Sequence, residues 1–170
     1  MTLLPYLAYF AFALWFSSVD IRVRKVPRRQ IWIASGALAV TMLLASMSPS
    51  GSASERRLLV AAVGAFALWA TYVLLGATSG GALGGGDARF AVPTGMVLGY
   101  TSADSVLVGG IAAFALAAIV GLIALGLRAP GRRRPAPSPR PRPSLPFVPF
   151  MSLGAAIGTT WPGSLAMLPG

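Results

Sequence analysis

The feature that most constrains this chain is a series of long apolar runs with few charges inside them. A helix needs about 20 apolar residues to cross a bilayer, and a spanning segment must satisfy its own backbone hydrogen bonds. Six runs approach this length, at residues 3–18, 31–47, 58–77, 90–100, 106–127 and 145–168. The sequence therefore predicts an all-α, polytopic membrane protein with about six transmembrane helices. The short run at 90–100 is expected to start in the preceding loop or to be partly re-entrant.

The amino-acid composition favours the same class. Hydrophobic residues make up 55% of the 170-residue chain and charged residues only 11%, whereas soluble domains contain roughly 25% charged residues. A soluble core cannot hide so much apolar surface in so short a chain, because small domains bury only part of their surface. The same figures exclude intrinsic disorder. We expect a single membrane-embedded domain over residues 1–170.

The basic residues give the chain a net charge of +10, and they cluster beside the apolar runs. Five lie at residues 22–29 and six at 128–142, and neither cluster contains an aromatic residue. Nucleic-acid grooves combine basic with aromatic side chains, so we expect no nucleic-acid partner. Basic loops beside apolar spans instead follow the positive-inside rule, and they can contact the anionic headgroups of the lipid bilayer.

The distribution of charge also predicts an orientation. No basic residue precedes the first run, so we expect a retained span with the N-terminus outside rather than a cleaved signal peptide. Loops 22–29, 80–89 and 128–144 then lie in the cytoplasm with twelve basic residues. The outer loops carry two, Arg56 and Arg57. The Arg- and Pro-rich loop 128–144 is expected to be either a flexible linker with topogenic charge or a dedicated binding motif.

Few residue types are available for catalysis. The chain has no Cys and no His, which excludes disulfides, a thiol nucleophile, thiolate zinc sites and the commonest general base. It also lacks a phosphate-binding loop of the G-x-x-x-x-G-K-[ST] form. We therefore expect no metal and no cofactor. Acid–base chemistry depends on four carboxylates, which are Asp20, Glu55, Asp87 and Asp104.

Asp20 and Asp87 are the candidate catalytic residues. In the predicted topology both reach the same membrane face, Asp20 after the first apolar run and Asp87 after the glycine-rich residues 80–86. Carboxylates at membrane depth are costly and usually functional. Two facing carboxylates share one proton, so that one activates a water and the other protonates a peptide carbonyl. This aspartic-protease chemistry needs neither Cys, His nor metal.

Structural roles for the acidic residues remain open as alternatives. Asp20 either takes part in such a pair or only balances the arginines that follow it. The glycines before Asp87 pack helices closely, form a turn with positive φ, or leave a bare backbone beside an extended substrate. Glu55 and Asp104 follow serines at the start of a span, and we expect both to be structural acids in the first turn of a helix.

The order of these segments resembles that of the type IV prepilin peptidases, and the resemblance spans residues 17–155. G-x-G-D alone is a weak motif, and its spacing relative to the other segments makes the resemblance more specific. Four segments carry it, in this order: Asp20 followed by Val26-Pro27, the GGGD of residues 84–87, Gly95 with Leu98-Gly99, and LPFVPFM at residues 145–151, which is similar to the P-F-x-P-F segment of that family.

The resemblance implies a GxGD-type aspartic endopeptidase of the bacterial cytoplasmic membrane, with Asp20 and Asp87 as its catalytic residues. Such enzymes remove the leader peptide of prepilins or pseudopilins at the cytoplasmic membrane face. Some members also methylate the new N-terminus and carry a cytoplasmic insert with paired cysteines. This chain has no cysteine and no room for the insert, so it resembles the short, peptidase-only form.

The resemblance also implies supporting residues around the aspartates. Gly84 and Gly86 are expected to shape the loop, and Arg89 to bias the charge of the aspartate or to bind headgroups. The chain departs from the family pattern at Arg28, where an Asn often follows the proline, and at Arg89, where Lys is usual; Arg keeps the charge but changes its geometry. The remaining motif residues are Pro27 after the first span and Pro146, Phe147 and Pro149 in the last-span motif.

Two other hypotheses use the same residues differently. A catalytically inactive family member would act as an assembly subunit of a pilus or secretion machine. A small ion- or proton-coupled transporter would use the two acids for ion binding and would cleave no peptide.

Overall fold

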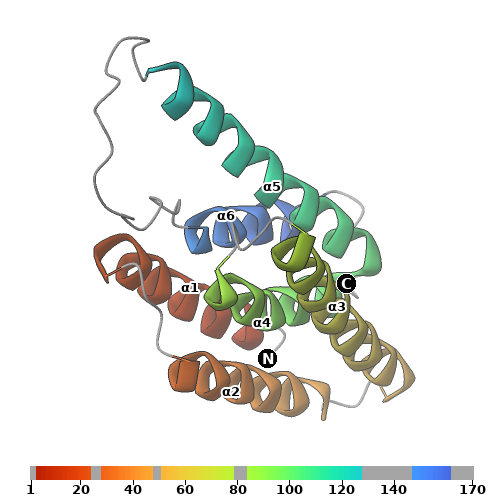
Figure 1. Ribbon diagram of the computed structural model, residues 1–170. Coiled ribbons are helices and arrows are strands. Elements are labelled where there is room, and N and C mark those ends of the chain that lie inside the picture. The colour runs from red at the N-terminus through yellow and green to blue at the C-terminus, as the bar shows by residue number, and fades with distance from the viewer. Residues whose placement is uncertain (1–2, 24–27, 48–50, 79–83, 128–146, 162–170) are drawn as a thin grey trace.

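The computed structural model describes residues 3–23, 28–47, 51–78, 84–127 and 147–161, and this part of the chain is helical, with no strand. The prediction of an all-α chain is confirmed for these residues. Six helices follow one another (Figure 1): α1 (Leu4–Val23), α2 (Arg28–Ser46), α3 (Gly51–Thr78), α4 (Gly85–Thr101), α5 (Ala103–Gly126) and α6 (Val148–Thr159).

Four of the helices are long and apolar enough to cross a membrane, at Leu4–Arg22, Arg28–Ser46, Glu55–Thr78 and Ala103–Ala124. Large apolar side chains project outward along them; Leu14 is 71% exposed, Phe66 67% and Ile111 69%. So wide an apolar surface is a liability in water, whereas lipid covers it at no cost. The described residues therefore have the build of a helical membrane protein.

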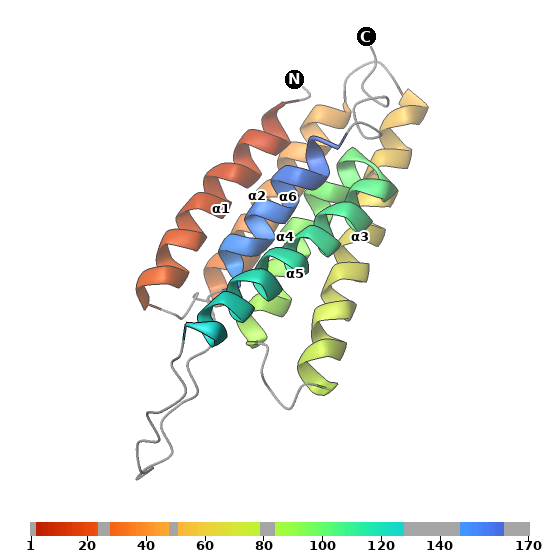
Figure 2. The same ribbon diagram turned by 90° about the horizontal axis from the view of Figure 1, so that it is seen from above.

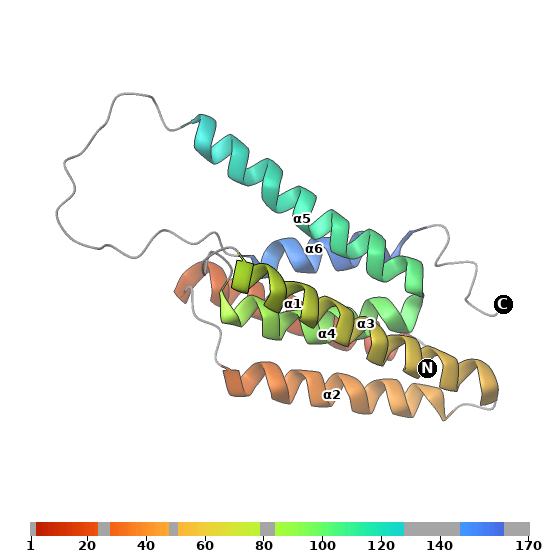
Figure 3. The same ribbon diagram turned by 45° about the vertical axis from the view of Figure 1, so that its right-hand side comes forward.

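Helix α4 lies inside the bundle. It spans 17 residues, and eleven of them are buried. It packs most extensively against α3 and also contacts α1, α2, α5 and α6, so that it lies between α2 on one side and the α5–α6 pair on the other (Figure 3). The helix begins at Gly85, five residues before the predicted run at 90–100, because the glycine-rich segment is continued into its first turn.

Two helix pairs are joined by seams of small residues. In the α3–α4 seam, a Cβ placed on Gly64 would lie 2.6 Å from the Gly95 carbonyl oxygen, and one placed on Gly99 would strike the Val60 carbonyl oxygen. In the α5–α6 seam, a Cβ on Gly154 would strike the Gly109 carbonyl oxygen. Small residues let helix backbones approach closely in membranes, where packing replaces the hydrophobic driving force.

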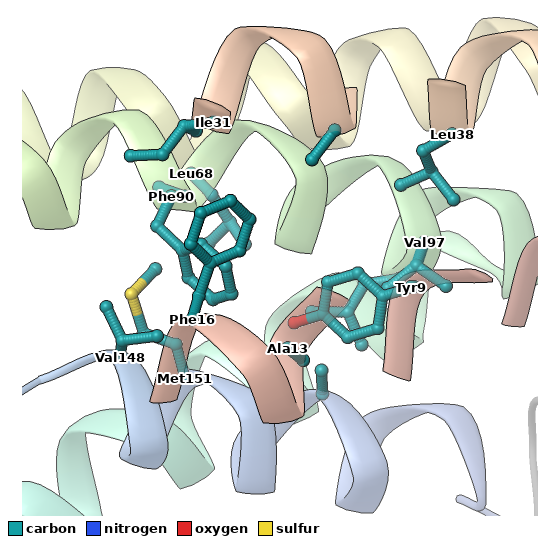
Figure 4. Packing of buried hydrophobic residues seen from close by; sticks show 14 of the residues in the cluster. Tyr9, Ala13, Phe16, Ile31, Leu38, Leu68, Phe90, Val97, Val148 and Met151 are labelled. Atoms are coloured by element: carbon teal, nitrogen blue, oxygen red, sulfur yellow. The ribbon is translucent and has the colours of Figure 1, made fainter. Parts of the chain in front are cut away.

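The core between α1, α2, α4 and α6 is aromatic and aliphatic (Figure 4). Phe16 of α1 meets Phe90 of α4 edge to face, with ring centroids 5.7 Å apart. Tyr9 is 1% exposed, and its hydroxyl pairs with Thr94 Oγ1 at 3.0 Å. This core fixes α1 against α4, and these two helices carry the candidate catalytic aspartates.

The helix limits differ from the predicted runs mainly at their N-terminal ends. Helix α2 begins at Arg28, three residues before the run at 31–47, and α3 begins at Gly51, seven residues before the run at 58–77. Polar residues that precede an apolar run extend a helix beyond the membrane without any sign in hydropathy. Helix α6, at 12 residues, is shorter than the predicted run at 145–168, of which residues 145–146 and 162–168 lie outside the described part.

Candidate active site

Asp20 lies within the last turns of α1 and not beyond the helix, and its side chain is 8% exposed. Its Oδ2 accepts a long hydrogen bond, 3.4 Å, from the backbone amide of Val148, the first residue of α6. One turn earlier, Ser17 Oγ lies 3.2 Å from Ser152 Oγ of α6. Asp20 therefore has a hydrogen-bond partner on another helix. The interpretation that it only balances the arginines after it did not include such a partner.

The N-terminus of α6 is built in a way that leaves its amides for Asp20. The first amides of a helix have no partner within the helix, and the N-cap residue, Phe147, makes no side-chain capping hydrogen bond. Pro149 lies in the first turn, where its missing N–H is not needed. The ring of Phe147 is 8% exposed and packs edge to face on Tyr72 of α3, with ring centroids 5.6 Å apart.

Asp87 lies in the first turn of α4 and is half-buried. Its Oδ2 accepts a hydrogen bond of 3.1 Å from the Gly84 amide, the N-cap residue of the same helix. A Cβ on Gly84 would lie only 3.2 Å from this oxygen, so the absence of a side chain at Gly84 gives the carboxylate room to fold back. An acid in this position is also stabilised by the positive end of the helix dipole.

The structure narrows the interpretations of the glycines before Asp87. Gly84 has φ −72° and ψ 141°, which any residue adopts, and neither Gly85 nor Gly86 has a positive φ. A Cβ on Gly86 would meet nothing within 4 Å, and one on Gly85 would meet only the tip of the Arg89 side chain. Neither a left-handed turn nor tight packing therefore requires glycine at positions 85 and 86. The remaining interpretation is a bare backbone that faces open space.

Arg89 binds its own helix. Its Nη1 donates a hydrogen bond of 2.6 Å to the Gly85 carbonyl oxygen. The guanidinium therefore lies over the first turn of α4, on the segment that also holds Asp87. This contact braces the glycine turn, a role that the sequence did not indicate.

The two aspartates lie at the same end of the bundle. The C-terminal end of α1 and the N-terminal ends of α4 and α6 come together there (Figure 2). Asp87 precedes the apolar part of α4 and lies outside the four candidate spans. The pKa of its carboxyl is raised to about 6, chiefly by burial, which the hydrogen bond from the Gly84 amide partly opposes and to which the negative charge of Asp20 adds. The two carboxylates thus interact electrostatically although they come from different helices.

This arrangement has the elements of general acid–base chemistry. A carboxyl group whose pKa is raised toward neutral pH is a candidate general acid, and a second carboxylate at the same end of the bundle is a candidate base. The described residues contain no group of three or more His, Cys, Asp or Glu side chains that would hold a metal ion.

Tyr72 is a site residue that the sequence analysis missed. It comes from α3, is 1% exposed, and interacts electrostatically with Asp87. Its ring stacks on Phe114 of α5 at 5.0 Å. The one available signal was a hydroxyl-bearing aromatic residue within the apolar run 58–77, which is a weak signal because tyrosines are common in membrane spans.

The other predicted residues lie either at the opposite end of the bundle from the aspartates or outside the described residues. Asp104 lies in the first turn of α5, as expected. The prediction for Glu55 is wrong, because α3 begins at Gly51 and Glu55 falls beyond its first turn. Pro27, Pro146 and the loop 128–144 lie outside the described residues.

Comparisons with known proteins give no further assignment: no family model, no curated protein and no solved structure matches this chain.

Proposed function

We propose that this chain is a membrane aspartic endopeptidase that removes the leader peptide of prepilins or prepilin-like pseudopilins at the cytoplasmic face of a bacterial cytoplasmic membrane. The observation that carries the proposal is that Asp20 and Asp87, from different helices, lie at the same end of the helical bundle, where the charge of Asp20 contributes to the raised pKa of Asp87. The order of sequence motifs around both residues supports the choice of family.

The mechanism assigns different tasks to the two carboxyl groups. Asp20, held by the Val148 amide, is the base that takes a proton from a water lying between the pair. Asp87, whose pKa is raised to about 6, donates its proton to the oxygen of the scissile carbonyl in the fraction of molecules that hold this proton. The water oxygen then bonds to the carbonyl carbon and forms a tetrahedral intermediate. Its collapse breaks the C–N bond: the proton held by Asp20 passes to the leaving amine, and one hydroxyl proton of the intermediate returns to Asp87.

The substrate segment is proposed to lie along the backbone of Gly85 and Gly86. The Arg89 guanidinium lies against Gly85, whereas a Cβ on Gly86 would meet nothing within 4 Å. An extended peptide can approach such a backbone closely. The apolar helix of the substrate would supply most of the binding energy by packing among the spans.

The orientation in the proposal follows from charge. Arg22, Arg28 and Arg29 lie at the aspartate end of the bundle, and Arg56 and Arg57 lie at the other end. Under the positive-inside rule the aspartate end faces the cytoplasm, where the basic leader of a prepilin is found.

The test is leader removal by two conservative variants. Asp20→Asn and Asp87→Asn are each co-expressed with a prepilin, and mass spectrometry of the pilin N-terminus reports cleavage, its position and any N-methyl group. We expect both variants to leave the leader in place and Glu55→Gln, an exposed acid at the other end, to cleave normally. Normal cleavage by either Asp variant refutes the pairing. Absence of cleavage by the wild type, with pilus assembly still dependent on the protein, would identify an assembly subunit instead.

A further inference from the structure

A cavity lies at the end of the bundle opposite the aspartates. The cavity has a volume of about 440 Å³ and opens between the N-terminal ends of α3 and α5 and the C-terminal end of α4. Those three ends lie together in Figure 2. Its lining consists of two arginines, two hydroxyl residues, one acid and small apolar residues: Arg56, Arg57, Val60, Gly99, Thr101, Ser102, Ala103 and Asp104.

The charges around this cavity favour an anion. Arg56 is exposed and Arg57 is half-buried, and only the Asp104 carboxylate among the lining residues opposes them. The first residues of α5, Ala103 and Asp104, also belong to the lining, and this helix N-terminus adds the positive end of a helix dipole. Ser102 accepts the Ser105 amide at 3.0 Å and so caps that helix. Arginine binds phosphate particularly well because its planar group offers several donors in one fork.

The position of the cavity favours a lipid as the source of the anion. Both arginines lie at the start of the candidate span Glu55–Thr78, and Ala103 opens the span Ala103–Ala124, so the cavity is at the level where headgroups lie. Directly along α3 and α5 from this point the surface is apolar: Leu59 is 68% exposed and Leu107 is 66% exposed. The acyl chains of a lipid whose phosphate occupies the cavity would thus lie against these apolar surfaces of α3 and α5.

Under the predicted topology these arginines are also the two basic residues on the outer side, where the positive-inside rule disfavours them. We propose that the cavity between α3, α4 and α5 binds the phosphate group of an anionic phospholipid. This site is independent of the peptidase activity, since it lies at the other end of the bundle, and either proposal can fail alone.

The test compares lipid binding by two matched arginine pairs. The purified full chain in neutral detergent is titrated with phosphatidylglycerol or with phosphatidylcholine of the same acyl chains, and native mass spectrometry counts bound lipid. The double variant Arg56→Gln/Arg57→Gln removes the proposed ligands. Arg28→Gln/Arg29→Gln is the control, because it removes an adjacent exposed arginine pair from the first turn of α2, at the other end of the bundle.

We expect one phosphatidylglycerol to bind in preference to phosphatidylcholine, and the Arg56/Arg57 variant to weaken its binding by about 30-fold. The control pair should change it by less than about twofold. Asp104→Asn removes the opposing charge and should tighten binding by about fivefold. A bulky side chain in Ala103→Leu fills the cavity with both arginines intact and should weaken binding.

Three results would overturn the proposal. Equal losses in the two arginine pairs mean diffuse attraction to the basic surface, and equal binding of the two lipids means that charge is not recognised. Inorganic phosphate or glycerol 3-phosphate that displaces the lipid at equal concentration means that the site takes a soluble phosphate and that the acyl chains contribute nothing.

Discussion

Gly95→Ala tests how α4, which carries Asp87, is held in the bundle. Gly95 faces Gly64 across the α3–α4 seam, and a Cβ at Gly95 would strike the Gly64 carbonyl oxygen and lie 2.7 Å from the Cα of Ala65. Both are backbone atoms, which cannot rotate away as the tip of a side chain can. The methyl group therefore has to be accommodated by moving one helix relative to the other.

The size of the effect follows from these distances. Carbon atoms make optimal contact at about 3.5–4.0 Å, so a contact at 2.7 Å requires α3 and α4 to separate by roughly 1 Å. Overpacking of this kind costs about 1–3 kcal/mol. Replacing a helical glycine by alanine also contributes a gain of roughly 0.5–1 kcal/mol in conformational entropy, which has to be measured separately.

Gly36→Ala supplies that measurement, because a Cβ on this exposed glycine of α2 would meet nothing within 4 Å. Unfolding of both variants is followed by helical circular dichroism in mixed micelles of rising denaturing-detergent fraction. We expect Gly95→Ala to lower the free energy of unfolding by about 1–3 kcal/mol relative to Gly36→Ala. Leader cleavage should fall as well, because α4 carries Asp87. Equal stability of the two alanine variants would show that the helices do not meet at this glycine.

Two further predictions concern single groups on α1 and α4. Tyr9→Phe removes the hydrogen bond to Thr94 and should lower the free energy of unfolding by about 0.5–1.5 kcal/mol; an unchanged unfolding curve contradicts the contact. The pKa of Asp87 is raised from 3.8 to about 6, so between these values the folded chain binds more protons than the unfolded one, and stability falls as pH rises through this window. Asp87→Asn should weaken that pH dependence and should have a higher melting temperature than the wild type at pH 7. The measurement is a series of thermal melts of both proteins from pH 4 to pH 8. Melting temperatures that change with pH in the same way in both proteins would refute the raised pKa.

Hydropathy predicted the helices because a membrane helix must be apolar over most of its length. Hydropathy did not predict where the helices end, because a helix end that projects beyond the membrane does not have to be apolar. The polar residues 51–57 continue α3 outward from the apolar run, and this extension moved Glu55 out of the first turn. The short run at 90–100 did not reveal α4 as a 17-residue central helix for a different reason. Helix α4 packs against five neighbours and is buried by protein on most sides, so it needs no full-length apolar surface toward lipid.

The candidate site was predictable in part. Counting spans places Asp20 and Asp87 at the same end of any bundle in which two spans, here α2 and α3, separate them. Nothing in the sequence indicated that the Val148 amide would reach Asp20 or that the charge of Asp87 would act on Tyr72. Both contacts depend on which helices become neighbours, and this is decided by seams such as Gly64 with Gly95, whose partners are recognisable only once the helices are packed.

The two ends of the bundle hold charge in different ways, and this difference explains the placement of the acids. At one end Asp20 lies against the N-terminus of α6, and Asp87 lies in the N-terminal turn of α4. Helix N-termini stabilise negative charge with fixed backbone dipoles and no mobile cation, so the charge of these acids does not depend on a cationic side chain. Direct pairing with arginine would lower their proton affinity and remove the acid function. At the other end, the exposed acid Asp104 shares a cavity with Arg56 and Arg57, as suits a site for binding rather than for proton transfer.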